Sequence, residues 1–141
     1  MPYVWIFVRP KIYQTEPLQQ FVNNLPGVIA EALSTSPGTA GELKPWEIEV
    51  EVFPFGPMGI HHYDIEILIF ANDYPERAEN LDDRTKKIAD MAPRAVTMSA
   101  LESLASRFFK PKITIKGFVW PLLTKGAFRE FSISYNRYDS R

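Results

Sequence analysis

The sequence predicts a single mixed α+β (α/β) domain of two tandem β-α-β units, with a mixed four- to five-stranded sheet and helices on one face. Short β-branched and aromatic runs alternate with segments whose apolar residues recur at helical spacing. Their order along the 141 residues is strand, helix, strand, and then strand, helix, strand again. The apolar runs at residues 3–8 and 65–70 occupy equivalent places in the two halves. This equivalence indicates an internal duplication.

The first half begins with a buried strand at residues 3–8, which ends where Pro10 removes a backbone donor. Apolar residues then recur at helical spacing over residues 18–33 and predict a helix. Pro26 and Gly27 lie inside this segment, so we expect the helix to be kinked or split into two pieces.

A loop at residues 34–41 separates this helix from a second predicted strand at residues 46–55. Three glutamates alternate there with isoleucine and valine, which is the pattern of a half-exposed strand. The second half starts with a more buried strand at residues 63–70. A helix from residue 76 or 79 to residue 91 follows, and Pro93 interrupts its pattern.

The remaining segments complete the second half. A capping-box signature at Ser99 predicts a further turn of helix through Phe109. Residues 112–120 predict a fourth strand, and residues 128–135 predict a fifth at an edge or against a partner. One domain at 1–141 therefore contains halves at about 2–57 and 63–121 and a C-terminal extension at 122–141.

Composition excludes several classes of function. The chain has no cysteine, which excludes disulfides and thiolate chemistry, and its net charge of −1 does not suggest nucleic acid or a membrane as partner. The first residues lack the pattern of a signal peptide, so we expect a cytoplasmic location. Adjacent His61 and His62 point to opposite faces of an extended chain, and we expect neither a metal nor a cofactor.

The distribution of charge and apolar surface predicts the partners. Basic residues outnumber acidic ones from Lys110 onward, which suits a small anionic ligand. Two helices cover only one face of the predicted sheet. The second apolar face is therefore expected to pack on copies of itself in a homo-oligomer.

Pro2 immediately precedes the first strand, and this placement before two β-α-β units resembles the tautomerase superfamily. The segment at residues 59–64, the apolar strand after it and residues 75–81 are similar to the second half of two members. These are 5-carboxymethyl-2-hydroxymuconate isomerase and cis-3-chloroacrylic acid dehalogenase. The resemblance covers nearly the whole chain.

The resemblance implies a homotrimer whose active sites lie at each N-terminal proline, near the subunit boundary. Arg77 occupies the place of an arginine that follows the strand in these relatives, and Arg9 matches an arginine of the shorter tautomerases. Glu130 is the nearest candidate for the acid that activates water in the dehalogenases. No other acidic residue matches that role.

Elementary chemistry agrees with these roles. Without the initiator methionine, Pro2 carries a secondary amine, and burial beside arginines brings this amine toward a working base at neutral pH. Arginine binds a carboxylate through two parallel hydrogen bonds and stabilises developing negative charge. Lys116 on the fourth strand faces either a ligand or solvent, and Phe118 belongs to a pocket wall or to the core.

Four functions remain open on the sequence. The first is a tautomerase or isomerase that moves a proton on an enol or keto carboxylic acid, with a small carboxylate-bearing substrate. The second is a hydratase or dehalogenase variant. The third is a non-catalytic oligomeric binding protein, which a retained Met1 favours because it makes the Pro2 nitrogen an amide. The fourth is a ferredoxin-like ligand-binding domain with an antiparallel sheet, in which Pro2 is incidental.

Overall fold

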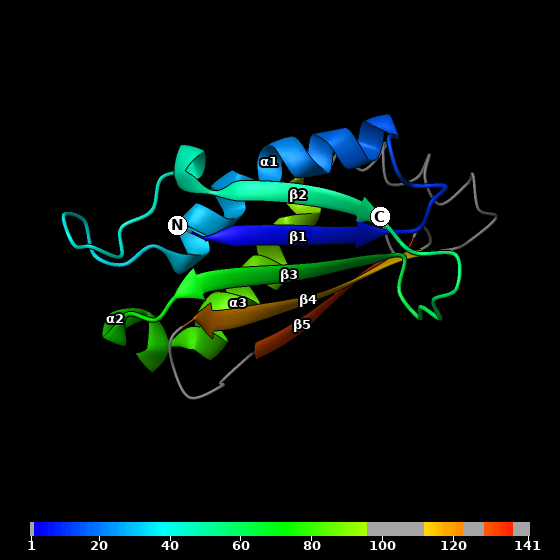
Figure 1. Ribbon diagram of the computed structural model, residues 1–141. Helices are drawn as coiled ribbons and strands as arrows, with labels where there is room; N and C mark the ends of the chain where they lie inside the picture. Colours follow the sequence, from blue (N-terminus) through cyan, green and yellow to red (C-terminus); the bar gives the residue numbers. More distant parts are fainter. Residues whose placement is uncertain (1, 96–111, 123–128, 137–141) are drawn as a thin grey trace.

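A computed structural model of the chain describes residues 2–95, 112–122 and 129–136, and only the backbone of residues 112, 120–122 and 129–136. Five strands form one sheet in the order β2-β1-β3-β4-β5 (Figure 1). The strands are β1 (Tyr3–Val8), β2 (Glu49–Pro54), β3 (Ile65–Asn72), β4 (Lys112–Leu122) and β5 (Arg129–Asn136). The helices of the described residues are α1 (Glu16–Leu33), α2 (Pro75–Glu79), α3 (Leu81–Met91) and the short 3-10 helices η1 (Pro45–Glu47) and η2 (Ala92–Ala95).

The sheet is mixed, as the sequence predicts. Strand β1 pairs with β2 in parallel and with β3 in antiparallel orientation, while β3 pairs with β4 in parallel and β4 with β5 in antiparallel orientation. The alternative of a ferredoxin-like domain with an antiparallel sheet is therefore wrong, because two of the four strand pairings are parallel. A parallel pairing requires a long crossover, and α1 lies in the chain between the two parallel strands β1 and β2.

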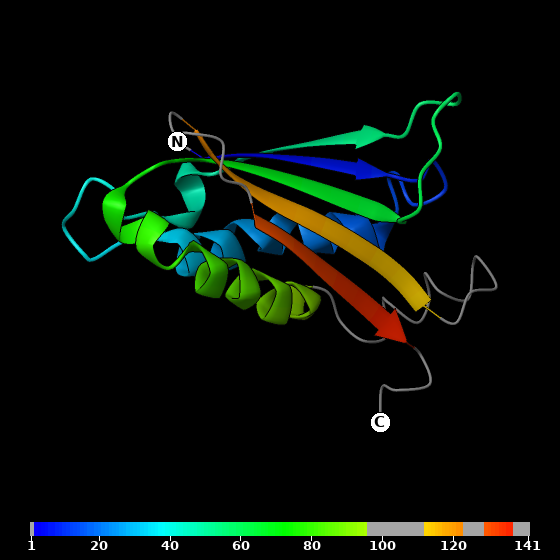
Figure 2. The ribbon, with the colours of Figure 1, turned by 90° about the horizontal axis from the view of Figure 1, so that it is seen from below.

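The core lies between the sheet and helices α1 and α3, which cover the same face (Figure 2). Strand β1 alternates between buried and more exposed side chains, so every second residue points to the helices. Fully buried apolar side chains come from both layers: Val4, Ile6, Val8, Leu25, Ile29, Leu33, Ile67, Ile69 and Ile88. This burial is the main stabilising contribution to the arrangement.

The opposite face of the sheet carries aromatic side chains. Trp5 is 42% exposed and Phe53 is 38% exposed. The Trp5 ring lies edge-on to Phe53 at 6.3 Å and to Phe70 at 5.0 Å between ring centroids. Phe7 stacks on Phe53 at 5.3 Å. None of the described helices covers these rings. We call the side of the sheet that carries them the open sheet face.

Helix α1 is continuous, so of the two expected outcomes at Pro26, a kink or a split, the split is wrong. Pro26 lacks the N–H that bonds to the preceding turn, yet Leu25 and Ile29 on either side are fully buried. Tertiary packing of an apolar helix face supplies most of the stability of a helix, and here it outweighs one missing hydrogen bond. Gly27 beside it has nothing within 4 Å of the position of an added Cβ, so the turn is not crowded.

Several boundaries differ from the prediction. Strand β2 begins at Glu49 because the preceding residues form η1, in which Trp46 is 81% exposed. Strand β3 begins and ends two residues later than predicted. The helix predicted to end at residue 91 is divided at Asn80, whose φ of −129° and ψ of 34° are not helical.

The last predicted elements have mixed outcomes. The fourth and fifth strands are confirmed as β4 and β5, and β5 lies at an edge of the sheet. The helix predicted at residues 99–109 lies outside the described residues. Among the helices that the structure describes, none has the length and apolar character needed to cross a bilayer.

Candidate functional site

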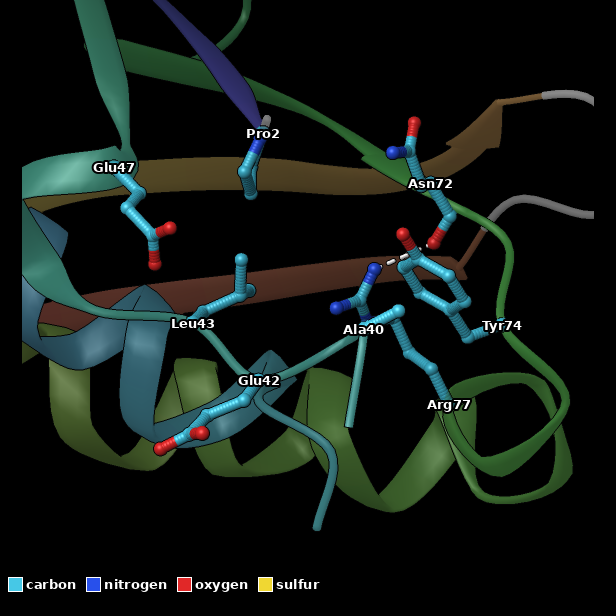
Figure 3. A pocket seen from close by; sticks show the side chains of 8 residues that line it. All are labelled: Pro2, Ala40, Glu42, Leu43, Glu47, Asn72, Tyr74 and Arg77. Atoms are coloured by element: carbon cyan, nitrogen blue, oxygen red, sulfur yellow. Dashed lines mark hydrogen bonds between the residues drawn. The ribbon is translucent and has the colours of Figure 1, made fainter. Parts of the chain in front are cut away.

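A hollow of about 90 Å³ lies at the beginning of β1 (Figure 3). It is lined by Pro2, Ala40, Glu42, Leu43, Glu47, Asn72, Tyr74 and Arg77. Because a water molecule occupies roughly 30 Å³ of liquid, the hollow of the single chain has room for a few waters. Two of the residues singled out from the sequence, Pro2 and Arg77, meet here.

The sheet register explains why Pro2 and Arg77 meet. Strands β1 and β3 are antiparallel with Tyr3 opposite Phe70, so the start of β1 lies beside the end of β3. The chain then runs from Asn72 at the end of β3 into α2, which carries Arg77. Pro2 is buried, and its carbonyl oxygen accepts a hydrogen bond from the Glu49 N–H at 3.2 Å.

Arg77 is a buried cation whose donors meet backbone carbonyls. Its side chain is embedded so deeply that the residue is only 3% exposed. Nε donates to the Leu33 oxygen at 2.8 Å, Nη2 donates to the Gly41 oxygen at 3.0 Å, and Nη1 donates to the Asn72 oxygen. Burial lowers the pKa of Arg77 from its usual value, and repulsion from Arg84 adds to this effect.

Arg77 therefore joins three segments around the hollow: the end of α1, the loop that contains Gly41, and the end of β3. Guanidinium carries five N–H donors. By count, these three bonds to carbonyl oxygens leave one hydrogen on each of Nη1 and Nη2. Two such hydrogens are the number that a carboxylate accepts from one arginine.

Arg84 of α3 also donates hydrogen bonds to carbonyls at the end of α1. Its Nη1 donates to the oxygens of Ala32 and Ser34, at 3.2 and 2.6 Å. Helix α1 has no basic residue in its own last turn, and the last carbonyls of a helix carry partial negative charge. Arg77 and Arg84 supply the complementary positive charge from the second half of the chain.

Tyr74 forms the wall of the hollow next to Arg77. The Arg77 guanidinium carbon lies 5.2 Å from the centre of the Tyr74 ring, which is within the range of a cation–π interaction. A Cβ at Gly41 would lie 2.9 Å from Tyr74 Cδ2 and 2.5 Å from Thr35 Oγ1. Only glycine fits at position 41, where the loop passes between Thr35 and the tyrosine.

Two carboxylates lie on the other side of the hollow. Glu47 accepts the Lys44 backbone N–H at 2.7 Å, and Figure 3 shows its side chain across the hollow from Arg77. The hydrogen bond from the Lys44 side chain, aided by the Gly38 N–H, lowers the pKa of Glu42. The same bond to Glu42 raises the pKa of Lys44. The hollow thus combines a buried guanidinium with two acids.

Arg9 lies at the opposite end of β1 from Pro2. The strand rises about 3.3 Å per residue, so the two residues are separated by roughly 20 Å. Arg9 Nε bonds to the buried Asp64 Oδ1 at 2.8 Å, and Asp64 Oδ2 accepts the Thr114 N–H at 2.9 Å. The Arg9 guanidinium also donates to the His61 oxygen at 3.2 Å. Within one chain this arginine joins β1, β3 and β4 and does not contact the hollow.

Lys116 and Phe118 lie on the open sheet face, away from the hollow. Lys116 Nζ lies 5.0 Å from the Tyr63 ring centre and 5.5 Å from that of Phe118. Glu66 is its cross-strand neighbour in the register of β3 and β4. The backbone of Glu130 lies in β5 opposite Phe118, and its side chain is outside the described residues.

Four polar residues of the hollow were not singled out from the sequence: Glu42, Glu47, Asn72 and Tyr74. Asn72 ends β3 and Tyr74 follows it, as Arg77 does, and the antiparallel pairing of β3 with β1 places them near Pro2. Glu42 comes from a loop without a periodic pattern, and Glu47, which the alternation of glutamates assigned to a half-exposed strand, lies in η1. Among the described residues, no group of three histidine, aspartate or glutamate side chains is arranged to hold a metal ion.

Comparisons of this chain with protein-family models, with curated proteins and with solved structures find no match.

Proposed function

We propose that this chain is a tautomerase or isomerase of the tautomerase superfamily, which moves a proton along a conjugated enol or keto carboxylic acid. The observation that carries the proposal is the shared hollow of Pro2 and Arg77. The parallel pairs β1–β2 and β3–β4, joined by antiparallel β1 and β3, support two β-α-β halves at about residues 2–57 and 63–121.

Pro2 is the proposed acid and base. With methionine removed, its secondary amine takes the proton from the enol hydroxyl, which leaves an enolate with negative charge on that oxygen, and then returns the proton to a carbon of the conjugated system. Arg77 disfavours the protonated amine, whereas Glu47 favours it, and the charge of Glu42 is offset by its ion pair with Lys44. The two remaining Arg77 hydrogens anchor the substrate carboxylate or stabilise the enolate oxygen.

The proposed assembly is a homotrimer built on the open sheet face. Tyr3, Trp5 and Phe53 are exposed at 44%, 42% and 38%. An apolar patch of this kind, uncovered by any described helix, is typical of an interface. Copies packed on this face bring the Arg9, Lys116 and Phe118 of one subunit toward a neighbour, which is how these residues enter the proposed substrate site.

A hydratase or dehalogenase is the second candidate, because Glu47 lines the hollow with Pro2. A carboxylate in that position activates a water molecule for addition to the substrate. Loss of hydration in Glu47→Gln, with ketonisation retained, is the result expected for this candidate. Glu79→Gln on the exposed side of α2 is its control.

The test of the main proposal compares Pro2→Ala with Pro10→Ala, an exposed proline at the far end of β1. Protein with a free Pro2 amine, verified by intact mass, is assayed for ketonisation of phenylpyruvate and 2-hydroxymuconate. We expect Pro2→Ala to lower kcat by about 10²- to 10⁴-fold, the range of acid–base catalysis, and Pro10→Ala to leave it unchanged. Equal turnover in both variants, or none in the unblocked wild type, contradicts the proposal and favours a non-catalytic binding protein.

A further inference from the structure

Strand β2 is an edge strand, and its outward main-chain groups follow from its register with β1. The Glu49 N–H donates to the Pro2 oxygen at 3.2 Å, and the Phe55 N–H donates to the Val8 oxygen at 2.8 Å. Successive residues of a paired strand turn their main-chain groups to alternate sides. The intervening Val50 and Val52 therefore direct their N–H and carbonyl groups away from β1.

No described strand pairs with this outer side of β2. The next outward residue is Pro54, which has no N–H to donate. The edge thus offers the N–H and carbonyl groups of Val50 and Val52 for pairing, and at Pro54 the donors end. Such an edge pairs readily with another extended chain.

The side chains of β2 divide by face. Glu49 and Glu51 are exposed on the side of the open sheet face, and neither forms an ion pair with a described residue. Val50 and Val52 are half-buried and point toward the helices. An added strand would thus meet carboxylates on one face and an apolar surface on the other.

A hollow of about 270 Å³ lies beside this edge, between β2 and the beginning of α1. It is lined by Tyr13, Gln14, Thr15, Leu18, Gln19, Val22 and Val52. None of these side chains is charged, and Leu18, Val22 and Val52 are apolar. The hollow suits an apolar side chain that projects from a strand paired with Val52.

We propose that the outer edge of β2 binds an extended peptide segment with lysine or arginine at alternate positions and apolar residues between them. The peptide main chain pairs with Val50 and Val52, its basic side chains lie opposite Glu49 and Glu51, and an apolar side chain enters the hollow. Pairing of β2 with β2 of a second copy is disfavoured, because glutamates would lie opposite glutamates. This site does not use the Pro2 hollow, and it requires that Glu49 and Glu51 remain accessible at the margin of the open sheet face.

The test uses two capped peptides of alternating sequence, Lys-Val-Lys-Val-Lys and Glu-Val-Glu-Val-Glu, with the full chain labelled for amide NMR. We expect the basic peptide alone to bind, and to shift and slow hydrogen exchange at the Val50 and Val52 amides. Equal binding of both peptides, binding of neither, or protection confined to other residues overturns the proposal. Protection of both amides without peptide, in a concentration-dependent dimer, assigns the edge to a second copy and also overturns it.

Reversing the charge of the two β2 glutamates tests whether the peptide is recognised by its basic side chains or only by main-chain pairing. In Glu49→Lys/Glu51→Lys we expect the basic peptide to bind about tenfold more weakly and the acidic peptide to gain affinity, because two attractive cross-strand pairs become repulsive. The control Glu79→Lys/Asp83→Lys changes the net charge equally on exposed positions of α2 and α3. An equal loss of affinity in the control contradicts recognition by the β2 glutamates.

Discussion

Arg77 Nη2 donates a hydrogen bond to the Gly41 oxygen at 3.0 Å, and this contact ties the loop below Pro2 to helix α2. The same guanidinium reaches the end of α1 and the end of β3. One buried side chain therefore determines the shape of the hollow. Arg77 is consequently a structural residue as well as the proposed substrate anchor, and experiments on it must separate these two roles.

Arg84 serves as the control for the structural role of Arg77, because it also binds the end of α1 but does not line the hollow. Arg77→Ala leaves buried carbonyls without donors, and we expect unfolding in urea to show a loss of about 3 kcal/mol, since unsatisfied buried groups cost about 1–3 kcal/mol each. Arg84→Ala removes two bonds to the same end of α1, so we expect a smaller loss.

Both variants should weaken the end of α1, but only Arg77→Ala should alter the pKa of the Pro2 amine, because Arg84 does not line the hollow. Removing a nearby cation raises the pKa of an amine. Amide and amine NMR titration of the protein with a free Pro2 measures this. Equal Pro2 pKa values in the wild type and in Arg77→Ala would show that Arg77 does not influence the amine.

Alanine substitutions at two glycines should change the free energy of unfolding in opposite directions. Gly41→Ala places a Cβ 2.5 Å from Thr35 Oγ1 and 2.7 Å from Thr35 Cγ2, so we expect a loss of about 1–3 kcal/mol from overpacking. Gly27→Ala lies in α1 with nothing within 4 Å, and we expect a gain of about 0.5–1 kcal/mol from helix propensity. Thermal and urea unfolding measure both. A stable Gly41→Ala would mean that the loop is not packed as the structure describes.

Asp64 is a buried carboxylate at the other end of the sheet, bonded to Arg9 and Thr114. Asp64→Ala removes the acceptor of Arg9 Nε and of the Thr114 N–H, while Arg9 keeps its bond to the His61 oxygen and its partial exposure, so we expect a loss of about 2–3 kcal/mol in urea unfolding. Thr114→Val removes the hydroxyl bond to Asp64 Oδ2, at 3.1 Å, and the longer bond that the same hydroxyl accepts from the Asp64 N–H, at 3.3 Å, and should cost about 1 kcal/mol. Similar losses in both variants would mean that the ion pair adds nothing to the hydroxyl bond.

The pair Glu42 and Lys44 predicts a pH effect of known sign. The Lys44 hydrogen bond lowers the folded-state pKa of Glu42 below the ordinary 4.5. A group whose pKa is lowered by folding adds stability that is complete above its unfolded pKa and is lost as the pH falls through the folded pKa. Carbon NMR of the Glu42 carboxyl group should show a lower pKa in the wild type than in Lys44→Met. An identical pKa in the two proteins would exclude the bond in solution.

The open sheet face predicts self-association. Trp5→Lys places a charge among aromatic rings that are 5.0 and 6.3 Å from the indole in the single chain. We expect this variant to sediment as a monomer and the wild type as a trimer, because the interface would lose the Trp5 ring and would have to bury a charged side chain. Trp46→Lys is the control, because Trp46 is 81% exposed on η1. A monomeric wild type contradicts the proposed trimer.

Particular elements show how far the sequence determined the fold. The β-branched and aromatic runs at residues 3–8 and 112–120 gave correct strands, because such residues favour the extended conformation locally, although Tyr3 and Trp5 of the first strand are more exposed than a buried strand predicts. The unbroken α1 was not predictable, since burial of Leu25 and Ile29 compensates for Pro26 only after the sheet is in place. The start of β2 was predicted too early, because Trp46, Glu47 and Ile48 continue the alternation of apolar and acidic residues although the first two of them lie in η1.

The same division applies to the candidate site. The sequence by itself determined the element order and made Pro2 and Arg77 candidates through local pattern and resemblance. The antiparallel pairing of β1 with β3 brought the two residues together, and it separated Arg9 from them. Only the tertiary structure showed that Arg77 donates to three carbonyls and that Glu42, Glu47, Asn72 and Tyr74 complete the hollow. Such contacts join residues far apart in the chain, and a local sequence pattern carries no record of them.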